Sequence, residues 1–384
     1  MGMAKAIDPK YDQEFLMVAV ESFMQQRSGH FLTYAYGEPI PESDYVGGGK
    51  HWVNLSQETD VYKFPQGHRF LLSNKAGEIS SAILDDTKSS LSGLPWHFIS
   101  LTPGADFAGQ DGLLVNGFHN AAQAHDEAVD ILTIADGNRD FRQNATEYVK
   151  RNHFQPSSIA ESDHNIFTTS LGDIHPTEIK KIKRRSVVVW AGGTLGNVGL
   201  KDGEIGFPDE AYIDNLQKQV DHSAEECYIV VLHNAFNKEA VLKYYSSPNT
   251  AQFVLSPLYR IKDELPTENF DPSKFEYQNS YDEDLEVVIH KIISTEKQTP
   301  FIGRRGFALQ KGDLATIAGY SGQITRDRMG AISSRAGFAR VTSFGHRLNG
   351  NPDAQVIATI LKATPDLMSA LRQGQKFRSH INPI

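Results

Sequence analysis

The chain has 384 residues, of which 40% are hydrophobic and 22% are charged, and its formal net charge is −9. This length supports a sizeable core and predicts two domains, or one large domain with an inserted lobe. The acidic balance argues against a nucleic-acid-binding protein, because such proteins need a basic face to displace counterions from phosphates. No apolar stretch reaches the ~18 residues that span a bilayer, and the first residues lack the apolar core of a signal peptide.

The single cysteine, Cys227, lies in the apolar run CYIVVLH. Without a second cysteine the chain forms no internal disulfide. A protein with this cysteine usage fits a reducing compartment, so we predict a cytoplasmic location.

From Asn74 onward, apolar runs alternate with amphipathic segments. The predicted strands are short and apolar: Trp96–Leu101, Asp130–Asp136, Asn165–Ile174, 186–191 and 227–234. The predicted helices between or before them are 74–91, 112–128, 139–152, 176–185 and 208–220. Strands of five or six apolar residues separated by helices indicate an α/β fold with a parallel, doubly wound sheet. Ligands of such sheets bind at the carboxyl ends of the strands.

After Ala235 the pattern changes. Residues 275–293 and 306–322 alternate polar and apolar side chains, which predicts antiparallel strands of a second lobe. SRAGFARVTSF (334–344) predicts the end of a helix, a glycine and a strand that returns to the first sheet. The tail 353–373 predicts a pair of amphipathic helices or one docking helix.

These patterns predict two domains. We assign residues 71–235 and 322–384 to the doubly wound core with its C-terminal extension. We assign residues 1–70 and 236–321 to an α+β lobe that covers the substrate at the carboxyl ends of the strands.

Asp136 ends the second predicted strand, where a carboxylate can accept both ribose hydroxyls of an adenosine cofactor. The alternative is a helix N-cap, because a predicted helix follows. The turn after the first strand, SLTPGADFAGQDG (100–112), lacks G-x-G-x-x-G, and the chain has no Walker A lysine. These absences disfavour NAD and ATP. They leave a cofactor with an adenosine and no phosphates, and S-adenosyl-L-methionine (SAM) is the obvious candidate.

Three other features have ordinary interpretations. The basic run 180–185 is interpreted as the solvated end of a helix, with cations that complement the helix dipole, rather than a nucleic-acid site. The histidines show no metal-ligand spacing, so no metal is predicted. His233 ends the fifth predicted strand and is the histidine placed to meet a ligand, with a structural role as the alternative.

The stretch GGTLGN (192–197) is similar to the G-S-T-I-G-N loop of the SAM-dependent histidine-specific methyltransferase family, which contains the ergothioneine-type amino-acid N-methyltransferases. Segments of 242–276, including LKYY, TAQF, YRIKDEL and FDPSKFE, resemble that family's A-Y, T-A-x-F, L-N-R-E-L and F-D-x-x-x-F-E. FLLSNKAGEI (70–79) and YSGQIT…RAGF (320–338) also resemble family segments. The resemblance extends from about residue 70 to 345.

The resemblance implies a class I methyltransferase (Rossmann-like) core, SAM as the cofactor and a small amino-acid-like substrate. The implied cofactor residues are Thr102, Gly104, Asp136, Asp173, Ile174, Gly192 and Thr194. Asn197, with Tyr244 or Tyr245, would hold the substrate carboxylate. A helix cap is the alternative role for Asn197.

The chain departs from the family at two places that bear on function. The family's first turn, E-L-G-S-G, is Ser100-Leu-Thr-Pro-Gly104 here, so the glutamate and one glycine are absent. The glutamate of the family's E-x-S, which helps to read the histidine ring, falls on Gly319, whereas the serine is kept as Ser321. We therefore predict that the substrate is a small amino acid or a derivative other than histidine.

Methyl transfer from a sulfonium is an in-line displacement, so the acceptor amine must be neutral when it reacts. Tyr245, His233 and Asp313 are candidates to take its proton. Two other interpretations stay open: a methyltransferase-like binding protein without turnover, and an unrelated α/β enzyme that uses NAD. The altered first turn favours the former, and the missing glycine fingerprint disfavours the latter.

Overall fold

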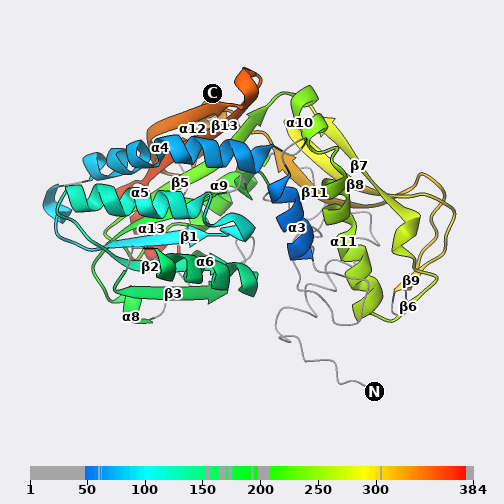
Figure 1. Cartoon of the computed structure of the whole chain (residues 1–384), viewed down its shortest axis with the longest axis horizontal. Coiled ribbons are helices and arrows are strands. Elements are labelled where there is room, and N and C mark those ends of the chain that lie inside the picture. The colour runs from blue at the N-terminus through cyan, green and yellow to red at the C-terminus, as the bar shows by residue number, and fades with distance from the viewer. Residues whose placement is uncertain are drawn as a thin grey trace. The chain divides into compact units, whose positions relative to one another are not determined.

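The computed structural model divides the chain into two compact units (Figure 1). The first unit contains 1–61, 199–206 and 242–321, and the second contains 62–198, 207–241 and 322–384. The residues that the structure describes are 48–58, 61, 63–87, 89–152, 156–163, 170–171, 175, 177–191, 194–197, 208–302 and 305–377. No helix in this described part is long and apolar enough to cross a membrane.

The second unit is built on a seven-stranded mixed sheet. In spatial order its strands are β12 (Phe338–Arg347), β13 (Ala354–Ala363), β5 (Glu226–Phe236), β4 (Arg185–Trp190), β1 (Trp96–Leu101), β2 (Val129–Asp136) and β3 (Ser158–Asp163). The five strands from β5 to β3 are parallel, whereas β13 is antiparallel to both β5 and β12. The order of the parallel strands reverses between β1 and β4, which is the switch point where doubly wound sheets bind ligands.

Helices cover both faces of this sheet, since its apolar strands must be buried on each side. The α-helices are α4 (Phe64–Asp86), α5 (Asp111–Ala124), α6 (Arg139–Arg151), α8 (Thr177–Lys180), α9 (Pro208–Lys218), α12 (Arg326–Arg335) and α13 (Pro365–Arg372). Short 3₁₀ helices are η1 (Ser89–Leu91), η2 (Gly104–Asp106), η3 (Thr194–Asn197) and η6 (Leu348–Gly350). Figure 1 shows α4 and α5 side by side on one face.

Alternate residues of β1 show how the two faces are filled. Trp96 and Phe98 contact Phe118 of α5 on one face. Ile99 and Leu101 belong to a core cluster with residues of α9, α12 and α13 on the other. Every residue of β1 is buried, including the polar His97 and Ser100, so its sequence shows no alternation between a buried and an exposed face.

The first unit contains α3 (Gly48–Gln57), α11 (Pro248–Glu264) and two small sheets. One sheet has the order β11 (Leu314–Gly322), β8 (Val287–Ser294) and β7 (Phe275–Asp282). The other contains β10 (Arg305–Gly306), β9 (Phe301–Ile302) and β6 (Thr267–Glu268), and η5 (Pro272–Lys274) precedes β7. The boundary between the units falls within α10 (Lys238–Tyr244) and at the last residue of β11.

Trp52 of α3 contacts Phe253 of α11, with ring centroids 5.4 Å apart. Ser247 caps α11 by accepting the N–H of Asn249, and Glu58 accepts the side-chain amide of Asn249 at 2.8 Å. Residues 48–58 are thereby held against α11.

The doubly wound α/β fold is confirmed, but three elements differ from the sequence prediction. The third parallel strand is β3, whereas it was expected at Asn165–Ile174, most of which lies outside the described residues. The tail 353–373 forms β13 and α13 rather than two helices, because its run VIATIL is buried between β5 and β12. The basic run is a solvated helix end only in its first part: Lys180 ends α8 and residues 180–183 are exposed, whereas Arg184 and Arg185 are fully buried.

Buried neutral histidines make the stability of the second unit dependent on pH. His68 donates to Asn234, and burial lowers the pKa of both His68 and His233 to about 4. The unfolded chain therefore binds more protons than the native state between pH 6.5 and 4, so stability falls as the pH falls through that window, by up to about 3 kcal/mol for each histidine. We expect the free energy of unfolding in urea to fall less between pH 7.5 and pH 4.5 for His68→Gln than for the parent protein.

The matched control for this experiment is His125→Gln, at the exposed C-terminus of α5. It is expected to keep the parent's pH dependence. An equal pH dependence in the parent and in His68→Gln would contradict the assignment.

Candidate functional site

The turn after β1 lies at the switch point and has an unusual backbone. Thr102 has φ 50° and Gly104 has φ 61°, so two residues of the turn are in the left-handed region. The Thr102 N–H donates to the carbonyl of Ala135 at 2.7 Å. Threonine therefore keeps, at a cost of about 1–3 kcal/mol, a conformation that suits the glycine found there in the family pattern.

Asp136 ends β2 beside this turn and is buried. Its Oδ2 accepts the N–H of Gly104 at 3.2 Å, and its Oδ1 accepts the N–H of Asn138 at 2.7 Å. The N-cap of α6 is Asn138, whose side chain accepts two backbone N–H groups. The side chain of Asp136 thus braces the first turn, and Asn138 rather than Asp136 caps the helix.

A second acid lies under the same turn. Asp111, the first residue of α5, is fully buried, and its Oδ1 accepts the hydroxyl of Ser100 at 2.7 Å. Burial raises the pKa of Asp111 to about 7. Its Oδ2 is buried without a hydrogen-bond partner, as are Thr102 Oγ1 and Gln110 Oε1. The turn therefore presents three acceptor atoms without donors among the described residues.

At the same edge of the sheet, β4 is followed by η3, which begins at Thr194 and ends at Asn197. A Cβ on Gly196 would lie 2.6 Å from the carbonyl oxygen of Gly322, so only glycine fits there. Asn197 is half-buried. The loop thus needs little side chain because another backbone segment crosses it.

Three predicted cofactor residues, Asp173, Ile174 and Gly192, lie outside the described residues.

The predicted substrate residues of the first unit lie around one polar cluster. Ser321 and Gly319 are two residues apart on β11 and so face the same side of the sheet. The Ser321 hydroxyl is bonded to Nε2 of His290 on β8 at 2.9 Å and to the phenol of Tyr245. Tyr245 and His290 pack edge to face, with centroids 4.8 Å apart, and Tyr244 is buried beside Tyr245 in the chain.

His290 continues the cluster to β7. Its Nδ1 is 2.8 Å from the hydroxyl of Tyr277, which is also bonded to the side chain of Asn279. Burial lowers the pKa of His290 to about 3 and raises the pKa of Tyr245 to about 12. The cluster is therefore neutral at ordinary pH.

His233 and Asp313 both take part in structural hydrogen bonds. Nδ1 of His233 donates to the carbonyl of Ile324 at 2.7 Å, and Nε2 is 2.9 Å from the hydroxyl of Thr359. Asp313 accepts the N–H of Gln310 at 2.7 Å within a turn. A proton-acceptor role for His233 would require one of its bonds to open.

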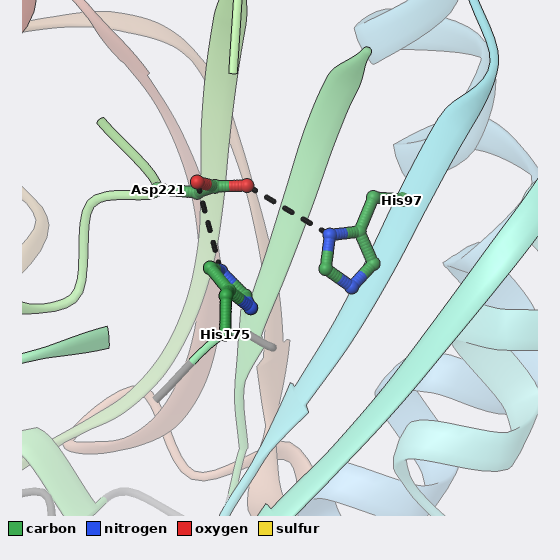
Figure 2. A group of neighbouring side chains, drawn as sticks. All are labelled: His97, His175 and Asp221. Carbon is green, nitrogen blue, oxygen red and sulfur yellow. Dashed lines mark ion pairs between the residues drawn. The ribbon is translucent and has the colours of Figure 1, made fainter. Parts of the chain in front are cut away.

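A group with metal-ligand chemistry lies at the opposite, amino end of the parallel strands. Figure 2 shows Asp221 facing both His97 and His175. One ligand atom of each of these residues lies within 4.8 Å of the others. Asp221 Oδ2 is 3.8 Å from Nδ1 of His97, and Oδ1 is 3.6 Å from Nε2 of His175. All three side chains are buried.

Arg184 already supplies the positive charge in this cluster. Its guanidinium binds both oxygens of Asp221, at 2.8 and 3.0 Å, and its Nε donates to Nδ1 of His97 at 3.2 Å. A divalent cation would place further positive charge beside the guanidinium in a fully buried site, which is costly. We interpret the cluster as a structural ion pair that joins the chain before β4 to the chain before β5.

A search of curated proteins found no match to this sequence. The model of a family described as "Histidine-specific methyltransferase, SAM-dependent" matches residues 160–349. Residues 160–349 belong to that family. The resemblance seen in the sequence is thereby confirmed, and so is SAM as the cofactor that the family's description names.

Solved structures with a similar fold include SAM-dependent methyltransferases of low identity. One from Clostridium acetobutylicum ATCC 824 is 9% identical, with 76% of this chain and 98% of that chain covered and a TM-score of 0.34. Magnesium protoporphyrin IX methyltransferase from Synechocystis PCC 6803 is 10% identical, with 83% and 94% covered and a TM-score of 0.35. A glycopeptide N-methyltransferase is 8% identical, with 76% and 94% covered and a TM-score of 0.30.

The seven-stranded sheet has the class I methyltransferase (Rossmann-like) architecture, and residues 160–349 match a family of SAM-dependent methyltransferases. The residues at its switch point fit that cofactor: a buried carboxylate, Asp136, ends β2, and unpartnered acceptors lie in the first turn. The match begins at residue 160, so roles for Thr102, Gly104 and Asp136 remain proposals.

Sequence reasoning missed Asp111, Tyr277 and His290. Asp111 reads as an ordinary acid in the first turn of a helix, and the signal that marks it is the small Ser100 directly opposite. His290 lies in an alternating strand, where a buried histidine cannot be told from a solvated one without the neighbouring strands.

Removing Asp221 tests the interpretation of the buried cluster. Asp221→Asn leaves the Arg184 guanidinium buried without a counter-charge, so it is expected to reduce the free energy of unfolding by about 3–5 kcal/mol in urea. Asp214→Asn, which removes an exposed pair with Lys376, is the control and is expected to cost less than about 1 kcal/mol. A metal chelator is expected to leave the parent's melting temperature unchanged, and a large drop would show that a metal binds there.

Removing Asp136 tests the ribose site. Asp136→Ala loses two charge-assisted hydrogen bonds to the ribose, each worth about 1.5–3 kcal/mol, so S-adenosylhomocysteine should bind at least about 100-fold more weakly in calorimetry. Asp130→Ala, at the other end of the same strand, is the control. Unchanged affinity in a folded Asp136→Ala variant would rule out the assignment.

Proposed function

We propose that this methyltransferase acts on the amine of a small α-amino acid, or of a metabolite derived from one, and not on histidine. The observation that carries the proposal is the neutral cluster in which Ser321 bonds to the protein's own His290 and to Tyr245. Gly319, on the same face, stands where the family pattern has the carboxylate that reads a histidine ring.

Tyr245 supports recognition of a carboxylate. With its pKa raised to about 12 by burial, it stays a protonated phenol at neutral pH and acts as a hydrogen-bond donor rather than a base. A phenol donor suits a substrate carboxylate, which accepts hydrogen bonds only.

The specificity against histidine rests on Gly319 and Ser321. If histidine binds here, its imidazole N–H has no carboxylate acceptor, which weakens its binding by about 1–3 kcal/mol. This corresponds to about 5- to 150-fold discrimination against histidine. The Ser321 hydroxyl is already bonded to an internal imidazole, that of His290. The missing side chain at Gly319 also favours a bulkier or more apolar substrate group.

When bound, SAM would supply an electrophilic methyl group to the acceptor nitrogen, with S-adenosylhomocysteine as the leaving group. The protein's task is to align the amine and exclude water, which is worth up to about 7–11 kcal/mol. Because Tyr245 is a neutral phenol and His233 uses both ring nitrogens, we propose that the amine binds already deprotonated. The methylated ammonium then loses its proton to solvent.

A methyltransferase-like binding protein without turnover is the second candidate. One observation favours it: the first turn holds Thr102 at φ 50° and lacks the family's glutamate. Such a protein would bind SAM and transfer no methyl group.

Radiolabelled methyl transfer to a panel of amino acids, and to matched amines without the carboxylate, tests the proposal. We expect transfer to amino acids other than histidine and little to the amines. Tyr245→Phe should raise KM for the amino acid about 10- to 150-fold, because it removes a hydrogen bond to a charged group. Tyr259→Phe on α11 is the matched control.

Efficient methylation of histidine would contradict the specificity. Equal activity on the amines, unaffected by Tyr245→Phe and Asn197→Ala, would contradict carboxylate recognition. Tight SAM binding without transfer to any panel member would favour the binding protein.

A further inference from the structure

The first turn of the second unit contains an acid with no assigned role. The family's glutamate is absent at Ser100, yet a carboxylate still occupies that place, because the Ser100 hydroxyl donates to Asp111 at 2.7 Å. The acid beside Ser100 therefore comes from the first residue of α5 rather than from the strand.

Asp111 is poorly satisfied as a purely structural residue. It is fully buried, and within the part of the chain that the structure describes one of its oxygens has no hydrogen-bond partner and no cation is paired with it. The groups that face it are Ser100 from β1, Asp106 from η2 and Asp136 from β2, and the two acids repel its charge. Arg69 of α4 is the nearby cation, but it is paired with Asp106.

We propose that Asp111, together with Thr102 and Gln110, binds the α-ammonium group of the methionine part of the cofactor. An ammonium group has three N–H donors, and this turn presents three buried acceptors without donors: Asp111 Oδ2, Thr102 Oγ1 and Gln110 Oε1. A buried carboxylate without a partner is costly, and a cationic ligand removes that cost.

The strained backbone supports the same reading. Thr102 holds φ 50° in a turn that is braced by the bond from Gly104 to Asp136, so the hydroxyl of Thr102 is kept in the turn at a conformational cost. Strain of this kind persists where a ligand uses the geometry. The inference rests on the cofactor of the proposed function and is independent of the methyl acceptor.

Two ligands separate the ammonium subsite from the adenosine site: S-adenosylhomocysteine, which has the amino-acid part, and 5′-methylthioadenosine, which lacks it. In calorimetry, Asp111→Asn is expected to lower the affinity for S-adenosylhomocysteine about 10- to 150-fold. The affinity for 5′-methylthioadenosine is expected to change by no more than about twofold. Asp126→Asn, an acid-to-amide change at an exposed turn, is the control and should leave both affinities unchanged. Since neither experiment contains a methyl acceptor, failure of the amino-acid substrate would not affect the result.

Proton linkage gives a second measurement on the unmodified protein. Asp111 has a pKa of about 7 when free and binds an ammonium as the carboxylate, so binding of S-adenosylhomocysteine should release about half a proton at pH 7. Its affinity should therefore rise from pH 6 to pH 8. Comparison of binding heats in phosphate and Tris buffers measures the release, which 5′-methylthioadenosine and Asp111→Asn should both lack.

Stability distinguishes a ligand-binding acid from a structural one. Neutralising an unpaired buried carboxylate should leave the melting temperature of the ligand-free protein unchanged or raise it, whereas loss of a structural acid would lower it. Unchanged affinity for S-adenosylhomocysteine in Asp111→Asn would mean that water fills the turn and would overturn the proposal. Equal weakening of both ligands would overturn it as well.

Discussion

The parallel pairing of β1 between β2 and β4 is the constraint on which the second unit depends. Its register sets Leu101 beside Ala135 and Trp190, so three strands end at one edge and begin at the other. At the carboxyl edge the turns that carry Asp136, Asp111 and Asn197 follow these strands directly. At the amino edge the same pairing gathers the buried charges around Arg184. One hydrogen-bond pattern therefore fixes both the cofactor edge and the ion pair that stabilises the opposite end.

The two edges use buried charge differently. At the amino edge both oxygens of Asp221 are bonded to Arg184, so its charge is compensated, although the ring nitrogens of the neighbouring His175 have no hydrogen-bond partner among the described residues. At the carboxyl edge Asp111 is buried with one oxygen unpartnered, next to the acid Asp136. A fold tolerates such an arrangement where a bound cation completes it, and the cofactor of this family carries one.

The sequence predicted the parts of the fold whose signal is local. The strands β1, β2, β4 and β5 are short apolar runs between helices, and a doubly wound sheet follows from them. β13 was mistaken for a helix because a strand buried on both faces does not alternate. Arg184 was assigned to solvent because its partner Asp221 is 37 residues away. In the site, Asp136 could be predicted because it is an acid at the end of a strand. Asp111 could not be predicted, because its place is set by the contact with Ser100 across the turn.

The chemistry of the two units can be separated by pH. In the first unit the pKa of His290 is lowered and the pKa of Tyr245 is raised, so the polar cluster keeps its protonation between about pH 5 and 9. In the second unit Asp111 titrates near pH 7. If the affinity for the cofactor changes across neutral pH, the change reports on the ionisation of Asp111 in the first turn. If the affinity for the substrate changes, the change reports on the ionisation of the substrate amine. The altered turn and the altered substrate cluster, which are the two departures from the family pattern, can thus be tested independently in the same intact protein.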